Sequence, residues 1–181
     1  YMPVRNNGLS FEWYLENVSK MTLDGNGNVG IGVVPSTWQS TRPAIQIGTK
    51  SAISSYNTDG RTLITTNDYV NSSGTHSYIE DGHAMKYEQF VGKHRFQVAS
   101  SGSAGNAISF TTAMTIDTAG KVGIGIAAPT ADLHIHNSAD HTRLNIDCSN
   151  SSGDNWQFQS RNNGEFWLRN DDNSRNDIVV Y

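Results

Sequence analysis

The stretch MTLDGNGNVGIG at Met21–Gly32 decides the fold, because it recurs as MTIDTAGKVGIG at Met114–Gly125. Met114 stands 93 positions after Met21, and a proline follows each copy within four residues, at Pro35 and at Pro129. In each copy a short strand ends at an aspartate, residues that tolerate positive φ follow, and a second strand returns. Repetition of this kind is typical of repeat architectures. The stretch therefore predicts a tight β-hairpin that the chain uses twice.

Glycines occupy the turn and one face of the return strand in both copies. Along the return strand, valine or isoleucine alternates with glycine, so that the aliphatic side chains share one face. Glycine weakens a strand unless something approaches it closely, and we expect backbone of a neighbouring strand or of a second chain to do so. The residues with these turn and close-approach roles are Gly25, Gly27, Gly30, Gly32, Gly120, Gly123 and Gly125.

The composition of the whole chain favours strands and turns over helices. Of its 181 residues, 36% are hydrophobic and 17% are charged, and both fractions are low for a globular domain. The chain has 24 Ile and Val against seven Leu, and twelve Asp against five Glu. β-branched residues suit strands, whereas Asp, Asn and Gly suit turns. A net charge of −4 is too small for a disordered chain. We predict an all-β fold.

Between the two hairpins, turn signals recur about every ten residues, as in β-sandwich or barrel-like modules. Examples are NTDG at 57–60 and NSSG at 71–74. The segment 11–18 could pass for one helical turn, but its counterpart at 110–113 is not helical, so strand and turn are predicted there. The other predicted strands lie at 44–47, 52–56, 62–66, 76–80, 85–90, 94–98, 107–110 and 114–116.

Several classes of protein are excluded by the sequence. No stretch approaches the roughly 18 apolar residues of a membrane span, and none resembles a signal peptide, so no membrane insertion is expected. Cys148 is the only cysteine, which excludes an internal disulfide framework, and the alternation around it predicts a buried strand position. Because the isoelectric point is near 5.8 and no Lys/Arg run occurs, nucleic acid is not an expected partner.

The repeats resemble a known group of proteins. The motif at 114–125, its proline and the following LHI strand at 133–135 are similar to the tandem modules of bacteriophage tail fibres and related virion appendages. IEDGHAMKYEQFVGKHRF at 79–96 and SAGNAISF at 103–110 are similar to the same proteins. The resemblance implies a homotrimer, contacts with other tail or virion proteins, and a place on the virion.

The expected organisation follows from the repeats. Residues 1–35 are expected to end one module, 36–128 to form a complete module, and 129–181 to open the next, as an excerpt of a longer chain. Because the chain has little aliphatic surface, it gains stability when copies bury their Val and Ile strands against one another. A closed threefold also covers sheet edges. We therefore expect tandem β-sandwich-like modules in an elongated, intertwined homotrimer that spaces and rigidifies a fibre for host attachment.

Three motifs suggest small-ligand sites. GIGIAA at 123–128 matches a dinucleotide fingerprint, but that fingerprint needs a following helix, which Pro129 disfavours. DGNGN at 24–28 begins like a calcium loop, but Val29 stands where an EF-hand needs glycine. His134 and His136 share one strand face, and in a trimer they would offer six imidazoles, an arrangement that binds iron in some fibres of the resembled group. The alternative is a solvent-facing strand edge. No cofactor is expected.

No catalytic residues are assigned. The carboxylate pairs Glu80-Asp81 and Asp171-Asp172 stand in turn-like contexts, and no cleft or nucleophile–base pair is indicated. A second candidate function is a carbohydrate-binding receptor module of a fibre or of a bacterial surface adhesin, because exposed aromatic rings can stack on sugars. The alternative is that the aromatic residues form a scarce core. The rings in question are Trp38, Trp156, Trp167, Tyr56, Tyr69 and Tyr78.

Overall fold

The computed structural model describes residues 4–6, 10–147, 155–170 and 175–180, with side chains described for 10–147 and 155–170. The described residues form strands, turns and connections, and none of them forms a helix, so no helix there is long and apolar enough to cross a membrane. The all-β prediction is confirmed. Cys148 and the Asp171-Asp172 pair lie outside the described residues.

The strands are β1 (Val4–Asn6), β2 (Ser10–Leu15), β3 (Val18–Asp24), β4 (Val29–Ile31), β5 (Ala44–Ile47), β6 (Ser51–Tyr56), β7 (Arg61–Thr66), β8 (Asp68–Val70), β9 (His76–Tyr78), β10 (Gly82–Phe90), β11 (Lys93–Gly102), β12 (Thr111–Ile116), β13 (Val122–Ile124), β14 (Leu133–Ile135), β15 (Thr142–Asp147), β16 (Asn155–Ser160), β17 (Phe166–Asn170) and β18 (Arg175–Val180).

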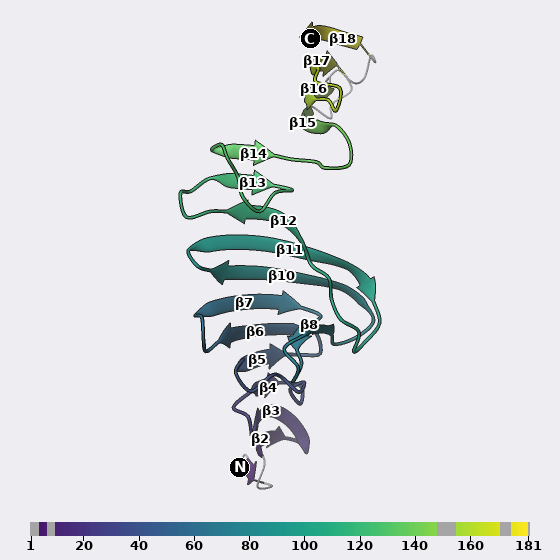
Figure 1. Ribbon diagram of the computed structural model, residues 1–181. Coiled ribbons are helices and arrows are strands. Elements are labelled where there is room, and N and C mark those ends of the chain that lie inside the picture. Colours follow the sequence, from purple (N-terminus) through teal and green to yellow (C-terminus); the bar gives the residue numbers. More distant parts are fainter. Residues whose placement is uncertain (1–3, 7–9, 148–154, 171–174, 181) are drawn as a thin grey trace.

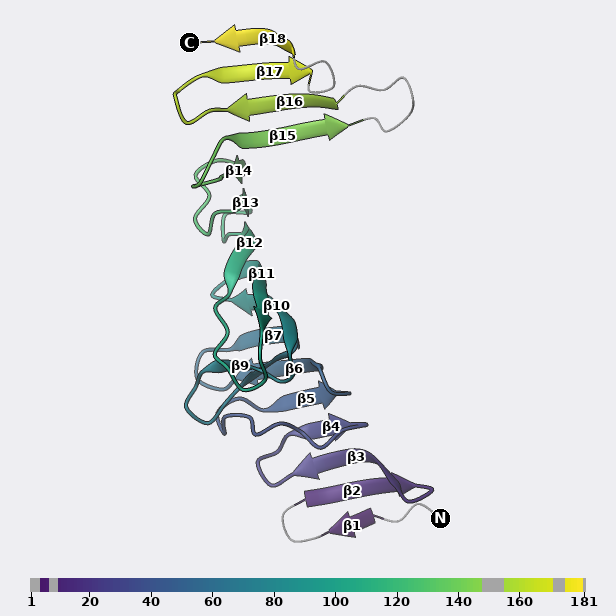
Figure 2. The same cartoon turned by 90° about the vertical axis from the view of Figure 1, so that its right-hand side faces the viewer.

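The 12-stranded and the four-stranded sheet follow one another along one long axis, with β1 and β18 at opposite ends (Figures 1 and 2). The largest has 12 strands in the order β1 to β7 followed by β10 to β14. A two-stranded sheet, β8–β9, lies beside it, and β15 to β18 form a separate four-stranded sheet. The strands run across the long axis, so the backbone hydrogen bonds between them run along it.

The two copies of the hairpin fold alike. Met21 pairs with Ile31 in β3–β4, and Met114 pairs with Ile124 in β12–β13. Each return strand then pairs in parallel with the next strand, β4 with β5 and β13 with β14. The connections into these parallel strands span 32–43 and 125–132, and they contain the module boundaries expected at 35/36 and 128/129. Hydrogen-bonded sheet continues across both connections, and the division into modules stays a prediction.

An aspartate organises each hairpin turn. Asp24 Oδ1 accepts hydrogen bonds from the backbone N–H groups of Asn26 and Asn28, at 2.9 and 2.8 Å. Asp117 Oδ1 accepts the equivalent two bonds in the second copy, both at 2.9 Å. The third turn residue, Gly27 or Gly120, has φ of +85° or +79°, a conformation that favours glycine. The Asp24 carboxylate is therefore engaged within the turn itself.

Most predicted strands are present, including the strand–turn–strand at 10–24, but the strand predicted at 107–110 is wrong. Those residues form a connection with a single bridge, between Ala107 and Ser77 of β9. The N–H of Ile108 donates to the His76 carbonyl at 2.8 Å, and the Asn106 carbonyl accepts from Tyr78 at 3.1 Å. The apolar alternation there places Ile108 and Phe110 against a core cluster instead of adding a strand to the large sheet.

One face of the large sheet is covered by connections and by β8–β9. Trp38, from the 32–43 connection, packs with Ala44 and Ala52 of the sheet and with Tyr69 of β8. Farther along, Tyr78 of β9 packs on alanines of β10 and β11. Small side chains on the sheet thus leave room for large aromatic rings from the covering segments. The cover consists of these short segments, and the buried core is divided into two small clusters.

Candidate functional site

The uncovered face of the large sheet has a continuous row of apolar side chains. Directly paired residues on adjacent strands point to the same face, so the pairing from β2 to β14 identifies the members of this apolar row. They are Phe11, Leu23, Val29, Ile45, Ile53, Ile64, Tyr87, Phe96, Met114, Ile124 and Ile135.

The apolar row is exposed to an unusual degree. The exposed fraction is 44% for Ile53, 51% for Ile64 and 43% for Phe96. On the covered face of the same strands, the side chains that are almost fully buried include Gln46 and Glu88. Isoleucine and phenylalanine are usually the buried residues, and glutamine and glutamate the exposed ones. A face with this inverted pattern is suited to be covered by another apolar surface.

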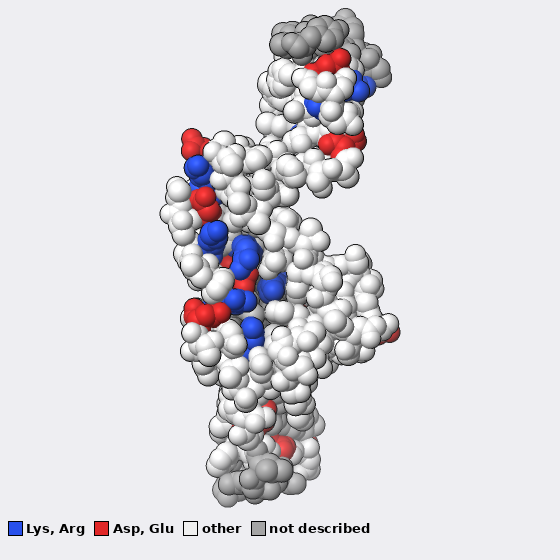
Figure 3. Space-filling view, in the orientation of Figure 1, with Lys and Arg blue, Asp and Glu red and all other residues white. Residues whose placement is uncertain are grey.

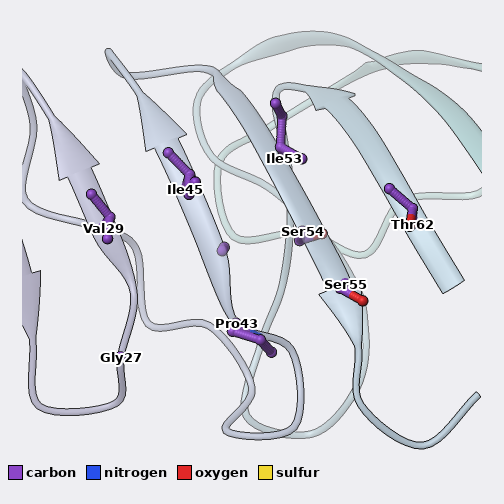
Figure 4. Close-up of a pocket in the computed structure, with 9 residues that line it drawn as sticks. Gly27, Val29, Pro43, Ile45, Ile53, Ser54, Ser55 and Thr62 are labelled. Atoms are coloured by element: carbon purple, nitrogen blue, oxygen red, sulfur yellow. The ribbon is translucent and has the colours of Figure 1, made fainter. Parts of the chain in front are cut away.

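A second, shorter row of apolar residues widens this face. Ile31 pairs with Ile47, and farther along Met85 pairs with Val98. Two shallow hollows open beside the apolar row. One, of about 290 Å³, is bordered by residues of β4 to β7 on the side away from Ile31 and Ile47, and the other, of about 340 Å³, lies between the two rows and is bordered by residues of β7, β10 and β11. Figure 4 shows the first, where the side chains of Val29, Ile45 and Ile53 stand side by side on three neighbouring strands. Both hollows have mainly apolar walls.

The four-stranded sheet repeats the inverted pattern. Leu144 pairs with Phe158 across β15 and β16, and their exposed fractions are 44% and 40%. Gln157 and Gln159 point to the opposite face of β16 and are buried. An exposed apolar face opposite buried amides is therefore common to both large sheets.

The glycines of the return strands face the covered side, where the chain's own connection reaches them. A Cβ at Gly30 would collide with the carbonyl oxygen of Val33 and lie 2.8 Å from the ring of Pro35. At Gly123 a Cβ would lie 2.5 Å from the carbonyl oxygen of Ile126. The segment that follows each strand takes the place that we expected a neighbouring strand or a second chain to occupy.

The glycines at the ends of the return strands have a different role. Gly32 and Gly125 have φ of +69° and +72°, and their N–H groups donate to the carbonyls of Lys20 and Ala113 at 2.9 Å. A Cβ at Gly125 would meet backbone of His136 on the neighbouring segment. Gly25, by contrast, is exposed and has no positive φ. The seven glycines thus divide into turn, strand-face and strand-end positions.

His134 and His136 point away from the apolar row. His134 pairs with Gly123, as Gln46 pairs with Gly30, so both imidazoles belong to the opposite face of the sheet. Their ring centroids are 6.1 Å apart, and Thr130 Oγ1 lies 3.3 Å from Nδ1 of His134. Within the described part of the chain, no three His, Cys, Asp or Glu side chains gather closely enough to hold a metal ion. The metal site stays a prediction that needs further copies.

The aromatic residues considered for sugar stacking are mostly engaged. Trp38 and Tyr78 are 2% and 5% exposed, and both are core residues. The Trp38 indole N–H donates to Gln46 Oε1 at 3.3 Å. Tyr56 is covered by the guanidinium of Arg42, whose carbon lies 4.1 Å from the ring centroid. The alternative interpretation, that these rings supply a scarce core, is confirmed for Trp38 and Tyr78.

A buried polar network lies under the β8–β9 cover. Both Asp68 oxygens lie 2.9 Å from Nδ1 of His76, and Nε2 of His76 lies 3.4 Å from Nζ of Lys86. The ammonium also lies 4.4 Å from the ring centroid of Phe110. Burial lowers the pKa of Lys86, although Glu88 and Asp68 act against the shift. The sequence gives no signal for this network, because its members come from three separate segments.

Comparisons with known proteins identify no relatives. No protein-family model matches the chain, and no curated protein sequence matches it.

Proposed function

We propose that this chain is a structural segment of a bacteriophage tail fibre or a similar virion appendage. In this proposal three copies associate through their apolar faces, and the assembled rod spaces and rigidifies the fibre for host attachment. The observation that carries the proposal is the apolar row, which extends from Phe11 in β2 to Ile135 in β14 and whose members are all exposed or half-buried. An enzyme needs a cleft with converging polar groups, whereas a fibre segment needs a long surface for its own copies.

The packing arrangement follows from the chemistry of the two faces. When copies place their apolar rows together, two or three sheets lie face to face, as in a sandwich whose layers come from different chains. In a single chain, the uncovered face of the large sheet exposes apolar side chains to water. The tandem sandwich-like modules and the homotrimer both belong to this proposal, as do the virion location and contacts with other tail proteins.

The mass in solution tests the assembly. Sedimentation velocity of the purified chain is expected to give a particle of three chains. The measurement covers roughly 1 to 50 µM, a range in which stable protein interfaces persist. Electron micrographs are expected to show rods. A folded monomer at 50 µM, with strand-type circular dichroism, would contradict the proposal. Aggregates without a defined mass would contradict it as well, because a closed assembly has a fixed number of copies.

The virion location needs a separate test. Antibodies raised against the purified segment are expected to label the fibres or tails of intact phage particles in negative-stain images. Labelling of a bacterial cell surface in uninfected cultures would instead support the second candidate, an adhesin. The two outcomes differ in the particle that carries the label, so a single antibody distinguishes them.

A further inference from the structure

Three arginines lie together on the covered face, at the ends of β5, β7 and β11. Figure 3 shows Lys and Arg gathered over the middle strands of this face, with acidic groups beside and between them. Arg42 precedes β5, Arg61 begins β7, and Arg95 lies near the start of β11. We call Arg42, Arg61 and Arg95 the arginine cluster.

Aromatic rings alternate with the guanidinium groups of this cluster. The carbon of the Arg42 guanidinium lies 4.1 Å from the Tyr56 centroid, and Tyr56 is the cross-strand partner of Arg61. The Arg61 guanidinium carbon lies 4.0 Å from the Phe90 centroid, and that of Arg95 lies 5.7 Å from it. Stacking on rings fixes the planes of the guanidinium groups in advance, so little freedom remains to be lost on binding.

The arginine cluster has more donors than its carboxylates satisfy. Glu88 lies between two of the arginines, 3.3 Å from Nε of Arg61 and 2.8 Å from Nη2 of Arg95. Asp59 contacts Nη2 of Arg61 at 3.1 Å. Arg42 has no ion-pair partner among the described residues. Two carboxylates therefore face three guanidinium groups.

Arg42 carries the clearest sign of an unfilled position. It is only 7% exposed, its Nε donates to Gln39 Oε1 at 3.3 Å, and its Nη1 has no hydrogen-bond partner in the described part of the chain. Burial and the neighbouring charge of Arg61 lower the pKa of Arg42. A buried, unpaired cation costs several kcal/mol unless an acceptor reaches it. One further anion beside Arg42 would satisfy both the charge and the free donor.

The arginine cluster has an excess positive charge of one unit, and this value favours an anion with a single negative charge. Lys86 is balanced by Asp68 through His76, so it adds nothing to the excess. A carboxylate supplies one negative charge, whereas a phosphate monoester supplies about 1.5 to 2 at neutral pH. Guanidinium groups bind carboxylates through paired hydrogen bonds. The other printed neighbours of the guanidinium groups are the rings of Tyr56 and Phe90 and the side-chain amide of Gln39, groups that suit a sugar unit better than an aliphatic peptide side chain.

We propose that the arginine cluster binds the carboxylate of an acidic sugar unit in a surface polysaccharide. Arg61 and Arg95 keep 22% and 28% of their side chains exposed, and both lie beside turns, so a sugar can approach from the strand ends. The site lies on the face opposite the apolar row, so association through that row would leave the exposed parts of Arg61 and Arg95 accessible.

Calorimetric titration with tetragalacturonate tests this site, at about 50 mM salt because screening weakens exposed ion pairs. We expect saturable binding of one carboxylate sugar per chain. Arg42→Gln removes the unpaired donor, and Arg61→Lys keeps the charge but loses the planar fork. Each is expected to weaken binding about tenfold or more, the usual effect of losing a charged hydrogen bond. Because Arg42→Gln removes a buried side chain, its circular dichroism is compared with that of the parent chain, and Arg61→Lys supplies the second measurement.

The controls separate this site from general charge attraction. Lys50→Gln removes one positive charge from an exposed ion pair with Glu80 and is expected to leave the affinity within twofold. Maltotetraose has the same length without carboxylates, and it is expected not to bind. The proposal is overturned by any of four results: no saturable binding of tetragalacturonate, equal binding of maltotetraose, an equal loss in Lys50→Gln, or tighter binding of tetraglutamate or inorganic phosphate.

Discussion

Replacing Ile64 by aspartate is expected to abolish assembly while the single chain remains folded. Ile64 lies in the middle of the apolar row and is 51% exposed. Full burial of an isoleucine side chain contributes about 1.5–3 kcal/mol, so covering the remaining half contributes about 1 kcal/mol per chain. An aspartate buried at the same place costs roughly 2–3 kcal/mol more, even when it takes up a proton. Three copies lose about 10 kcal/mol together.

This loss is about seven orders of magnitude in the association constant, since each 1.4 kcal/mol is tenfold. In the isolated chain the same change costs about 1 kcal/mol, the range of strand propensities at an exposed position. Sedimentation velocity at 10 µM is therefore expected to show the variant as a monomer with unchanged far-ultraviolet circular dichroism. Val34→Asp is the matched control, because Val34 is 69% exposed and lies outside the row. An Ile64→Asp chain that assembles as well as Val34→Asp would refute the role of the row.

Four further changes test single features of the fold. Gly123→Ala is expected to lower the free energy of unfolding, measured by urea titration, by about 2 kcal/mol or more, because the new Cβ meets a carbonyl oxygen. The control is Gly25→Thr, since threonine stands at that place in the second hairpin, and it should change the free energy of unfolding by no more than about 0.5 kcal/mol. Asp117→Ala removes two hydrogen bonds to the turn and is expected to cost about 1–2 kcal/mol in the same assay; an unchanged midpoint would mean that the turn forms without them. Val91 has φ of +49° before Gly92, a geometry that favours Asn, so Val91→Asn is expected to raise thermal stability by about 1 kcal/mol. Burial lowers the pKa of Lys86, so the unfolded chain binds more protons than the folded chain between that pKa and 10.5, and stability rises with pH in this window. Lys86→Met should therefore flatten the rise in the free energy of unfolding measured from pH 7 to 10.5.

The hairpins were predictable because their chemistry is local. Asp24 and Gly27 lie three residues apart, and the bonds that shape the turn all fall within it. The parallel pairing of β4 with β5 was not predictable in the same way. It depends on how the 32–43 connection folds back over Gly30, and that contact joins residues whose types carry no pairing signal.

The polarity of the two faces was also beyond the reach of the sequence pattern. Alternation shows that Ile53 and Ala52 point in opposite directions, but it does not show which of them is covered. The cover is provided by Trp38 and Tyr78, which come from a connection and from a short strand. Isoleucine is usually the buried residue, but here the large rings of Trp38 and Tyr78 pack over alanine, so the alanine face is the covered one. The arginine cluster was missed for a similar reason, because its members are spread over more than fifty residues of sequence.

The direction of the strands has a mechanical consequence. Because the strands lie across the long axis, a pull on the two ends of the chain separates neighbouring strands one hydrogen bond at a time. The hydrogen bonds of such a sheet break one after another at low force, whereas sliding two sheet faces past one another breaks many contacts at once. A rod built from this chain would therefore owe its tensile strength to the contacts between copies rather than to the backbone hydrogen bonds within each sheet. Cutting one chain would leave such a rod intact, whereas removing the apolar contacts that Ile64 and its neighbours make between copies would let the copies separate under tension.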